Sequence, residues 1–375
     1  MHIMMTQRSL KAAVEPFAGV CAGYDRLSIY SHLHLRADGE KLTIRGARES
    51  LRLELECDCE TKEPGALWVL GESFVKAALA MDEGIVELET AGKGFLSVKG
   101  GSAVRYDIAM RDSSAYPEWP EVAVAGETWR CCRSIMEEML RKTVYAMSSG
   151  RDGNTYLKVV HGIVRDGRVT LEATDGRRLA RVEQDLDMVD EVEADFTIPG
   201  EAARLLYALL GKDGNPADVR IATLAGETEF ASRAQRWKLV AKQQAAKKPF
   251  PGLGRIIDAF KRDMLITVDR ALLLNALKKM LLTCDGEDRI VKVSVAKGRM
   301  KLDGKIDGIM SGEAEFACAC ESPKTYRASF NAKLLLDAIG AIDDDEVQLD
   351  VGEGGVLAIR SSVPALAMVM PLREG

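Results

Sequence analysis

Pairs of histidines and acids at alternate positions are the residues of this chain that could most directly do chemistry. His32 and His34 stand two residues apart in a strand-like stretch, so both would lie on one face, as two ligands of a metal ion do. The sequence supplies no convincing third ligand beside them. Asp58 and Glu60 share that spacing, but alternating acids on a strand are more typical of a solvated face than of an acid/base pair. We therefore expect no metal, no cofactor and no catalytic residue.

Eight cysteines are present, and none of them forms the CxxC pair of a zinc ribbon or redox motif. Cys57 and Cys59 alternate with other residues in a strand-like stretch, and so do Cys318 and Cys320. A chain of this size does not need disulfides to fold. These cysteines are therefore predicted to be small hydrophobic residues of the interior rather than metal ligands.

The common motifs of enzymes are also missing. The chain has no GxxxxGK[ST] loop that would cradle a nucleotide and no GxSxG turn that would present a nucleophilic serine. We expect a protein that is not an enzyme, although an enzyme stays the first alternative.

Length and composition bound the remaining possibilities. With 375 residues, 47% hydrophobic and 29% charged, the chain is typical of a globular protein with two or three domains. It has no apolar run of membrane-spanning length and no signal-peptide pattern over residues 1–10, so we expect a cytoplasmic protein without a membrane partner. A net charge of −6 argues against a general nucleic-acid binder, unless the basic residues are gathered on one surface.

The sequence repeats one pattern three times. Each third has an amphipathic helix, over residues 7–20, 135–147 and 270–282, followed by two strands around a tight turn. The turns are predicted at Asp38-Gly39, Asp166-Gly167 and Lys297-Gly298, which are 128 and 131 residues apart. A second strand and helix follow in each third, where Leu70, Ile198 and Phe330 occupy equivalent places at separations of 128 and 132 residues. Two independent landmarks therefore agree on the repeat.

This repeat predicts the fold class. Runs of strands after a helix, without regular βαβ alternation, indicate α+β with antiparallel sheets. We predict three domains of one fold, 1–127, 128–260 and 261–375, each with two helices packed on antiparallel sheets. Links are expected at 116–120 and 248–254, where proline and glycine gather, with an exposed loop over 242–248.

A triplicated domain can form half of a closed ring if two chains join head to tail. The first helix of each third carries basic residues, which would then line the hole: Arg8, Lys11, Arg133, Arg141, Lys142, Lys278 and Lys279. The alternative is that these side chains only solvate helix faces.

Three segments carry a resemblance to a known family: LEATDGRRLA at 171–180, FPGLGRII at 250–257 and MVMPLRE at 368–374. In this order and within a triplicated chain, they resemble the beta subunit of bacterial DNA polymerase III, the sliding clamp family. The threefold repeat extends the resemblance over essentially the whole chain.

The resemblance implies a DNA-clamp fold and a ring-shaped homodimer that encircles duplex DNA without reading its sequence. It also implies a processivity factor that tethers the DNA polymerase III alpha subunit, clamp-loader subunits and other proteins with clamp-binding motifs. Carried over position by position, the pocket for their peptides would be formed by Leu157, Thr174, Gly176, Arg177, Arg178, Leu179, Pro251, Arg255, Ile256, Asn331, Leu334, Met368, Val369, Met370, Pro371, Leu372 and Arg373.

Such a pocket makes chemical sense. Met370, Leu372 and Leu179 offer an adaptable apolar floor, and Arg178, Arg255 and Arg373 can donate hydrogen bonds to a peptide. Taken alone, residues 368–372 are more typical of an ordinary buried edge strand. Their place at the chain end and the resemblance together favour the pocket.

DNA contacts and the ring interface also follow from the resemblance. Tyr24 or Arg26 and Arg151 would contact phosphates without reading bases, as sliding requires. Tyr106 would meet Leu281 and Leu282 of a second chain. Two further alternatives stay open: a monomeric, clamp-derived scaffold that binds peptides without encircling DNA, and a clamp that serves a phage or plasmid.

Overall fold

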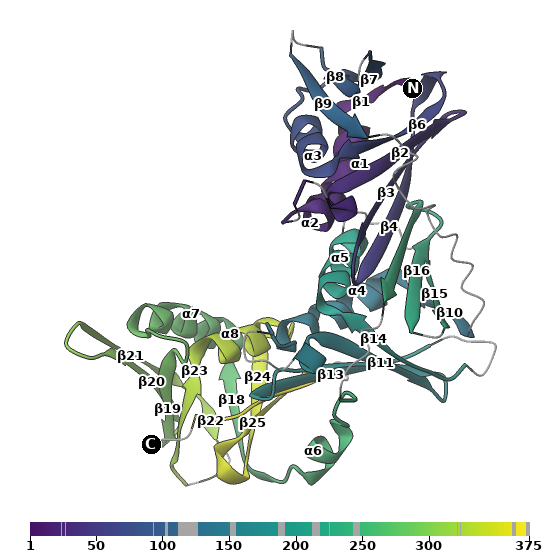
Figure 1. Cartoon of the computed structure of the whole chain (residues 1–375). Helices are drawn as coiled ribbons and strands as arrows, with labels where there is room; N and C mark the ends of the chain where they lie inside the picture. The colour runs from purple at the N-terminus through teal and green to yellow at the C-terminus, as the bar shows by residue number, and fades with distance from the viewer. Residues whose placement is uncertain are drawn as a thin grey trace. The chain divides into compact units, whose positions relative to one another are not determined.

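The computed structural model describes residues 1–23, 25–26, 28–92, 94–101, 104–111, 127–150, 155–186, 192–211, 218–224, 226–242, 248–320, 322, 324–361 and 365–372. The described chain is α+β with antiparallel sheets, which confirms the predicted fold class (Figure 1). It separates into two compact units, the first made of Met1–Glu137 and Glu201–Ala245, the second of Glu138–Gly200 and Ala246–Gly375. Each unit combines strands from two of the three predicted domains, and the three-domain division itself stays a prediction.

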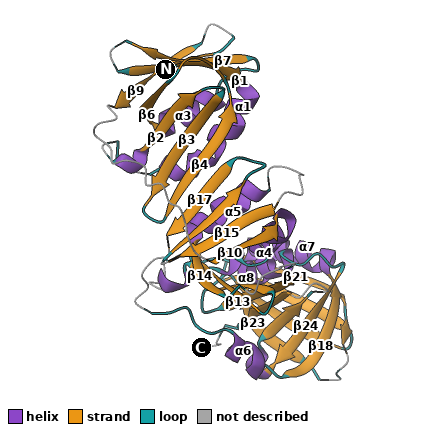
Figure 2. Ribbon diagram, turned by 90° about the vertical axis from the view of Figure 1, so that its right-hand side faces the viewer, coloured by secondary structure: helices purple, strands orange, loops and turns teal. Residues whose placement is uncertain are grey.

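One continuous sheet of thirteen described strands runs through the first unit, as Figure 2 shows from β9 to β15. Its spatial order is β10 (Glu127–Cys132), β15 (Asp218–Leu224), β16 (Glu227–Ser232), β17 (Trp237–Lys242), β4 (Leu51–Asp58), β3 (Lys41–Arg48), β2 (His32–Asp38), β6 (Gly65–Leu70), β9 (Arg105–Arg111), β8 (Phe95–Lys99), β7 (Ile85–Ala91), β1 (His2–Thr6) and β5 (Glu60–Glu63). The pairing of β17 with β4 joins the first predicted domain to the second through backbone hydrogen bonds.

Helices cover this sheet. They are α1 (Gln7–Val14), η1 (Glu15–Phe17), α2 (Ala18–Cys21), η2 (Ile29–Ser31), α3 (Gly71–Leu79), α4 (Arg133–Arg141) and α5 (Gly200–Leu210), the last two straddling the division between the units. The single helix predicted over 7–20 is broken by the 3-10 turn η1, because Pro16 cannot donate the backbone hydrogen bond that a continuous helix needs. The Thr6 hydroxyl accepts from the Ser9 amide and starts α1, which packs against α3.

Two sheets form the second unit. The larger has the order β14 (Ala194–Pro199), β11 (Val159–Arg165), β12 (Arg168–Thr174), β13 (Arg178–Asp185), β26 (Ala365–Val369), β25 (Leu357–Arg360), β24 (Glu346–Gly352), β18 (Arg262–Asp269) and β22 (Ala319–Cys320). The smaller has the order β21 (Met310–Ala317), β20 (Arg299–Ile306), β19 (Ile290–Ala296) and β23 (Tyr326–Asn331).

The helical elements of this unit are η4 (Val144–Ala146), η5 (Thr155–Leu157), α6 (Gly254–Ala259), α7 (Arg270–Met280), η6 (Leu281–Thr283), α8 (Ala332–Gly340) and η7 (Glu353–Gly355). Asp269 caps α7 by accepting from the Leu272 amide, and α7 packs against α8 (Figure 1). Their buried faces and both sheets enclose one hydrophobic core, with Leu277 and Phe330 fully buried in it.

The predicted repeat is visible in the element order. Six times a strand runs directly into a helix with no residue between them: β1–α1, β6–α3, β10–α4, β14–α5, β18–α7 and β23–α8. Two of these passages fall in each predicted domain. The strand before the first helix of each third was not predicted, because periodicity located the helices more clearly than the short strands that precede them.

The predicted hairpins form, with one shift in position. Asp166-Gly167 and Lys297-Gly298 connect their strands as two-residue loops with positive φ at both positions, for which glycine is well suited. The first loop consists of Gly39 and Glu40, one residue later than predicted, because Asp38 still pairs with Lys41.

Some of the basic residues expected to line a hole have other roles. Arg133 is buried and donates to the Leu210 carbonyl, and Lys142 is buried beside Glu138 and Asp343. Both charges therefore have partners, a backbone carbonyl for Arg133 and carboxylates for Lys142. Arg8, Lys11, Lys278 and Lys279 are exposed, as a solvent-facing basic surface requires. The predicted link at 116–120 and most of the loop at 242–248 lie outside the described residues.

Candidate peptide-binding site

The C-terminal strand β26 lies between β13 and β25 in the larger sheet of the second unit. Leu179 of β13 stands opposite Met368, and Arg178 stands opposite Val369. Because side chains alternate along a strand, Val369 points into the core while Leu179 and Met368 share the other face. The tail residues thus form a buried strand, as the edge-strand alternative predicted. The strand is not at an edge, because it pairs with a neighbour on both sides.

The segment that precedes α6 covers this outer face. Leu253 is buried in a small cluster with Leu179, Ala358 and Met368, and Ile257 packs against its margin. We call residues 248–260 the linker. The cluster therefore holds the linker against β13, β25 and β26. It also fixes the position of Pro251, Arg255 and Ile256, which the resemblance assigned to the pocket.

The ATDG turn has a geometry that only this type of sequence satisfies. The Asp175 carboxylate accepts from the amides of Arg177 and Arg178, each at 2.9 Å. Gly176 has a φ of +87°, which favours glycine. The buried Thr174 hydroxyl donates to the Arg178 carbonyl at 2.6 Å. Side chain and backbone thus lock the turn that carries the predicted residues 174–179.

Arg178 is used inside the protein, in contrast to its predicted role as a donor to peptides. Its side chain is 9% exposed and binds Asp175 and Asp337, at 3.0 Å each, while its guanidinium lies over the Tyr145 ring. These contacts use Nε and Nη1 of the guanidinium, so Arg178 connects the turn to α8 and shapes the wall. Arg177 pairs with Asp288 at 2.8 Å and is exposed.

The residues of α8 and the tail complete the wall. Asn331 caps α8 by accepting from the Lys333 and Leu334 amides, and its side-chain amide donates to the Glu287 carbonyl. The Met370 amide donates to the Arg177 carbonyl at 2.8 Å, and the Leu372 amide donates to Ser329 of β23 at 2.7 Å. The tail therefore passes from one sheet of this unit to the other.

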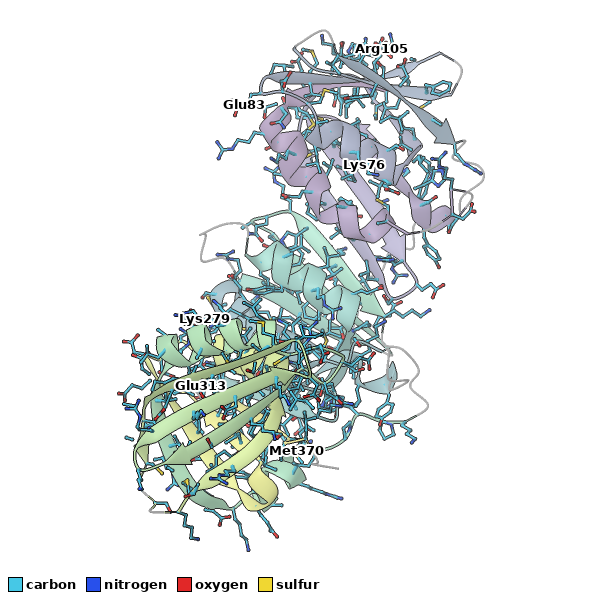
Figure 3. The ribbon with its side chains drawn as sticks, turned by 90° about the vertical axis from the view of Figure 1, so that its left-hand side faces the viewer. Lys76, Glu83, Arg105, Lys279, Glu313 and Met370 are labelled. Atoms are coloured by element: carbon cyan, nitrogen blue, oxygen red, sulfur yellow. The ribbon has the colours of Figure 1, made fainter. Side chains whose placement is uncertain are left out.

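Two apolar side chains of the predicted pocket stay exposed. Ile256 is 49% exposed and Met370 is 47% exposed (Figure 3). Arg255 is also exposed, while Pro251, Leu334, Pro371 and Leu372 are half-buried. Exposed apolar groups beside a buried apolar floor are the pattern of a surface that binds a peptide side chain. Leu157 is buried in η5, and Arg373 lies outside the described residues.

A polar row that was not predicted crosses the same outer face, next to the apolar cluster. His161, Glu172 and Arg181 stand opposite one another on β11, β12 and β13. The His161 ring contacts Glu172 at 3.0 Å and Asp195 at 2.9 Å, one carboxylate at each nitrogen. Burial alone would lower the pKa of His161, but the two hydrogen bonds outweigh it and hold the pKa above its usual value.

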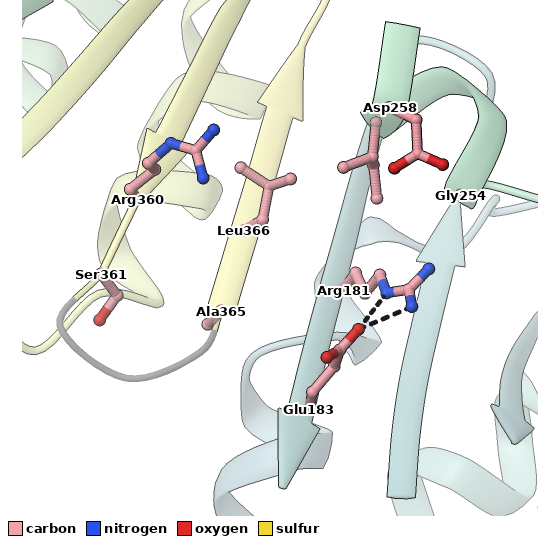
Figure 4. A pocket seen from close by; sticks show the side chains of 9 residues that line it. Arg181, Glu183, Gly254, Asp258, Arg360, Ser361, Ala365 and Leu366 are labelled. Atoms are coloured by element: carbon pink, nitrogen blue, oxygen red, sulfur yellow. Dashed lines mark hydrogen bonds and ion pairs between the residues drawn. The ribbon is translucent and has the colours of Figure 1, made fainter. Parts of the chain in front are cut away.

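A cavity of about 370 Å³ lies between α6 and the strands β13, β25 and β26 (Figure 4). Its lining is mainly charged, with Arg181 paired to Glu183 on β13, Arg360 on β25 and Asp258 on α6. Ile257 and Leu366 line it as well and also pack against the apolar cluster. The cavity therefore shares α6 and the margin of the apolar cluster with the predicted pocket.

The residues predicted for DNA and for the ring interface are placed as follows. Arg26 is exposed, while Tyr24 and Arg151 lie outside the described residues. Tyr106 on β9 is 40% exposed. Leu282 in η6 is 70% exposed, whereas Leu281 packs partly against the core of the second unit.

The histidine pair does not gather metal ligands in the described part of the chain. Nδ1 of His32 lies 3.1 Å from the Ser28 carbonyl, and His34 lies half-buried against the Trp68 ring. Among the described residues, no group of three or more histidine, cysteine or acidic side chains is arranged to hold a metal ion. Within the same residues, no helix has the length and apolar character needed to cross a membrane.

Known proteins are similar to this chain in sequence and in fold. Residues 260–372 match the family described as DNA polymerase III beta subunit, C-terminal domain. The beta sliding clamp of Halalkalibacterium halodurans is 20% identical and that of Pseudomonas putida 22% identical, with 93% and 100% of this chain covered and 92% and 100% of theirs. The crystal structure of the DNA polymerase III beta subunit from Thermotoga maritima superimposes over all of both chains with a TM-score of 0.87 at 20% identity. Residues 260–372 therefore match the C-terminal domain of the DNA polymerase III beta subunit family, and the whole chain is similar in sequence and in fold to beta sliding clamps.

Proposed function

We propose that this protein is a sliding clamp: a homodimeric ring around duplex DNA that tethers replication and repair proteins through short peptides. The observation that carries the proposal is the outer face of β13 and β26. There Leu179 and Met368 are buried with Leu253 in one cluster, and two residues that follow closely in the chain, Ile256 and Met370, expose their side chains. An apolar site beside a locked turn fits the apolar anchors of a peptide. We infer a cytoplasmic scaffold that works by tethering.

Two open strand edges support the ring. β21 ends the smaller sheet of the second unit, with the exposed Glu313 on it (Figure 3). On β9 of the first unit, only Met110 and Arg111 pair with β6, so the earlier residues face no described strand on that side. An unpaired edge is a natural place for strand addition. Two copies that join β9 to β21 head to tail close a ring.

Exposed apolar side chains accompany both edges. Phe95, Val104 and Tyr106 are exposed on or near β8 and β9. Leu282 is exposed in η6, and Ile309 and Met310 are exposed at the end of the β20–β21 hairpin, where Ile309 is 82% exposed. Apolar residues gathered at an open edge favour a protein partner, and a second copy supplies the matching surface. The exposure of Tyr106 and Leu282 supports their assignment to the proposed interface.

Contacts with DNA are proposed for Arg26 and Arg151 and for the exposed basic residues of α1 and α7. The net charge of −6 is compatible with this role because a local basic surface attracts phosphates regardless of the total charge. We expect Arg151→Ala to weaken DNA binding equally for all sequences and to reduce the slope of log affinity against log salt by about one. A loss that depends on DNA sequence contradicts sliding.

A peptide-binding experiment tests the pocket. The probe is a fluorescein-labelled clamp-binding peptide of a bacterial DNA polymerase III alpha subunit, and the readout is fluorescence anisotropy. Ile256→Ala is expected to weaken binding about tenfold, the effect of losing roughly 1.4 kcal/mol of apolar contact. Ile290→Ala is the matched control, because Ile290 is exposed to a similar extent, 47%, on β19. Equal affinities of the two variants refute the pocket assignment.

A further inference from the structure

His161 lies between two carboxylates, and this arrangement requires a charged ring. Glu172 contacts one ring nitrogen and Asp195 the other. A carboxylate only accepts hydrogen bonds, whereas a neutral imidazole has a single N–H to donate. Only the imidazolium, with two N–H donors, satisfies both partners. His161 and Glu172 are both largely buried, so a mismatched contact is costly there.

The same ring also contacts the linker. The Phe250 ring lies over His161, with centroids 4.8 Å apart and planes inclined by 31°. An aromatic ring at this distance attracts a cation more strongly than a neutral ring. Phe250 immediately precedes Pro251, and the chain continues through the buried Leu253 to Ile256. The charge on His161 therefore acts on the segment that forms one wall of the proposed pocket.

We propose that protonated His161 is a positioning residue that holds the linker in its binding-competent place, so that peptide affinity falls as the pH rises. The proposal deepens the proposed function and rests on it. When His161 loses its proton, one hydrogen bond to a carboxylate and the attraction to Phe250 are lost together. The linker is then held mainly by Leu253, and Pro251 and Ile256 sample more positions.

The other charged groups around His161 come from the neighbouring strands and from the linker. Glu172 lies 3.6 Å from Arg181, which pairs with Glu183 on the same strand, and Asp195 is largely exposed on β14. On the linker, the Lys248 ammonium lies over the Tyr156 ring. Histidine is the side-chain type whose ordinary pKa, about 6.5, lies nearest to neutral pH, and His161 is the histidine of this site. The remaining histidines, His2, His32 and His34, all belong to the first unit.

The direction follows from the protonated form being the binding form. Affinity is highest below the pKa of His161 in the folded protein and declines as the pH rises through that pKa. With an acetylated alpha-subunit peptide that lacks histidine and cysteine, we expect about three- to tenfold tighter binding at about pH 6 than at about pH 8.5, the range that corresponds to one weakened contact.

The variants separate positioning from general structural support. His161→Gln is expected to bind about as weakly at both pH values as the wild-type chain binds at the higher one. Phe250→Leu keeps an apolar side chain but removes the ring, and it is expected to flatten the pH profile although His161 still titrates by NMR.

His2→Gln is the matched control, because His2 also contacts a carboxylate, that of Glu87 at 2.6 Å, in the other unit. It is expected to keep the wild-type pH profile.

A second readout does not depend on peptide. Hydrogen exchange of the linker amides, residues 250–260, is compared between the full-length wild-type chain and His161→Gln at the same pH, so that intrinsic exchange rates cancel. Greater protection in the wild type at low pH, vanishing at high pH, supports the proposal. If that pattern appears but no peptide binds at any pH, the proposed function fails and the positioning role stands. If peptide binds equally well at both pH values and linker protection is the same in both proteins, the proposal is overturned while the pocket stands.

Discussion

Leu179 and Met368 stand directly opposite each other on β13 and β26, and Leu253 of the linker buries both from above. These residues are 189 positions apart in the chain, and the pairing of their strands creates a surface that neither strand has alone. The C-terminal strand is thus a structural part of the sheet as well as the floor of the proposed pocket.

This arrangement predicts that two equally exposed methionines have separate roles. Met370 and Met310 are each 47% exposed in the second unit, but Met370 follows β26 while Met310 lies at the open edge of β21. Met370→Ala is expected to weaken peptide binding about tenfold and to leave the oligomeric state unchanged. Met310→Ala is expected to leave peptide affinity unchanged and to weaken self-association. Anisotropy and light scattering on both variants check this, and the reverse pattern contradicts both assignments.

The two arginines of the ATDG turn are predicted to differ in stability. Arg178→Ala leaves the partly exposed carboxylates of Asp175 and Asp337 without their largely buried partner and is expected to lower the free energy of unfolding by about 2–3 kcal/mol, less than for a fully buried pair. Arg177→Ala breaks only an exposed pair with Asp288 and is expected to cost less than about 1 kcal/mol. Urea unfolding followed by circular dichroism measures both. Similar losses would show that Arg178 does not brace this turn against α8.

Glycine is required at one position beside the polar row. A Cβ on Gly162 would stand 2.3 Å from the ring of Phe196, a fully buried side chain. Gly162→Ala is therefore expected to destabilise the second unit by about 1–3 kcal/mol or more through overpacking. Gly252→Ala, where no atom lies within 4 Å, is the control and is expected to change stability little. The melting temperatures of both variants are compared with that of the wild-type chain. An unchanged melting temperature for Gly162→Ala would be inconsistent with the packing of β11 against β14.

The first unit contains a histidine with the opposite behaviour to His161. Burial, followed by the nearby Arg45 and Arg36, lowers the pKa of His34 to about 4. Between about pH 6.5 and pH 4 the unfolded chain therefore binds more protons, so stability falls as the pH is lowered through this window. His34→Phe keeps a ring against Trp68, removes the titration and is expected to reduce this acid sensitivity by about 1–2 kcal/mol, allowing for solvent screening. Unfolding curves at several pH values test it, and an undiminished acid sensitivity argues against a neutral His34.

Much of the fold was predictable from local sequence. The Asp-Gly and Lys-Gly turns, the second helices of each third and the threefold spacing all depend on residues close together in the chain. Two details differ from the prediction. The first helix is interrupted by one turn at Pro16, and the first hairpin loop is shifted by one residue to Gly39 and Glu40. The continuous sheet through β4 and β17 was not predicted, because alternation shows that a strand exists but not which strand it pairs with.

The candidate site was predictable where it consists of one motif. The turn at 174–179 and the tail at 368–372 were identified from their sequences, and the structure joins them as neighbouring strands. The role of Arg178 in the pocket stays a prediction, and its ion pair with Asp337, 159 residues later, was not predicted because a sequence does not show this contact. His161, Glu172 and Leu253 were missed because their importance depends on cross-strand register and on where the linker lies. The sequence around His161 does not show that Glu172 and Asp195, which come from other strands, will contact its ring.

The central claim is that two copies of this chain close into a ring, and the solution mass tests it most directly. Light scattering or sedimentation over a dilution series of the full-length protein is expected to give twice the 40.9 kDa mass of one chain. Tyr106→Arg, which places a charge at the proposed interface, is expected to shift this mass toward the monomer at low concentration. A monomer at every concentration would contradict the ring, and a peptide-binding scaffold that does not encircle DNA would then be the better account.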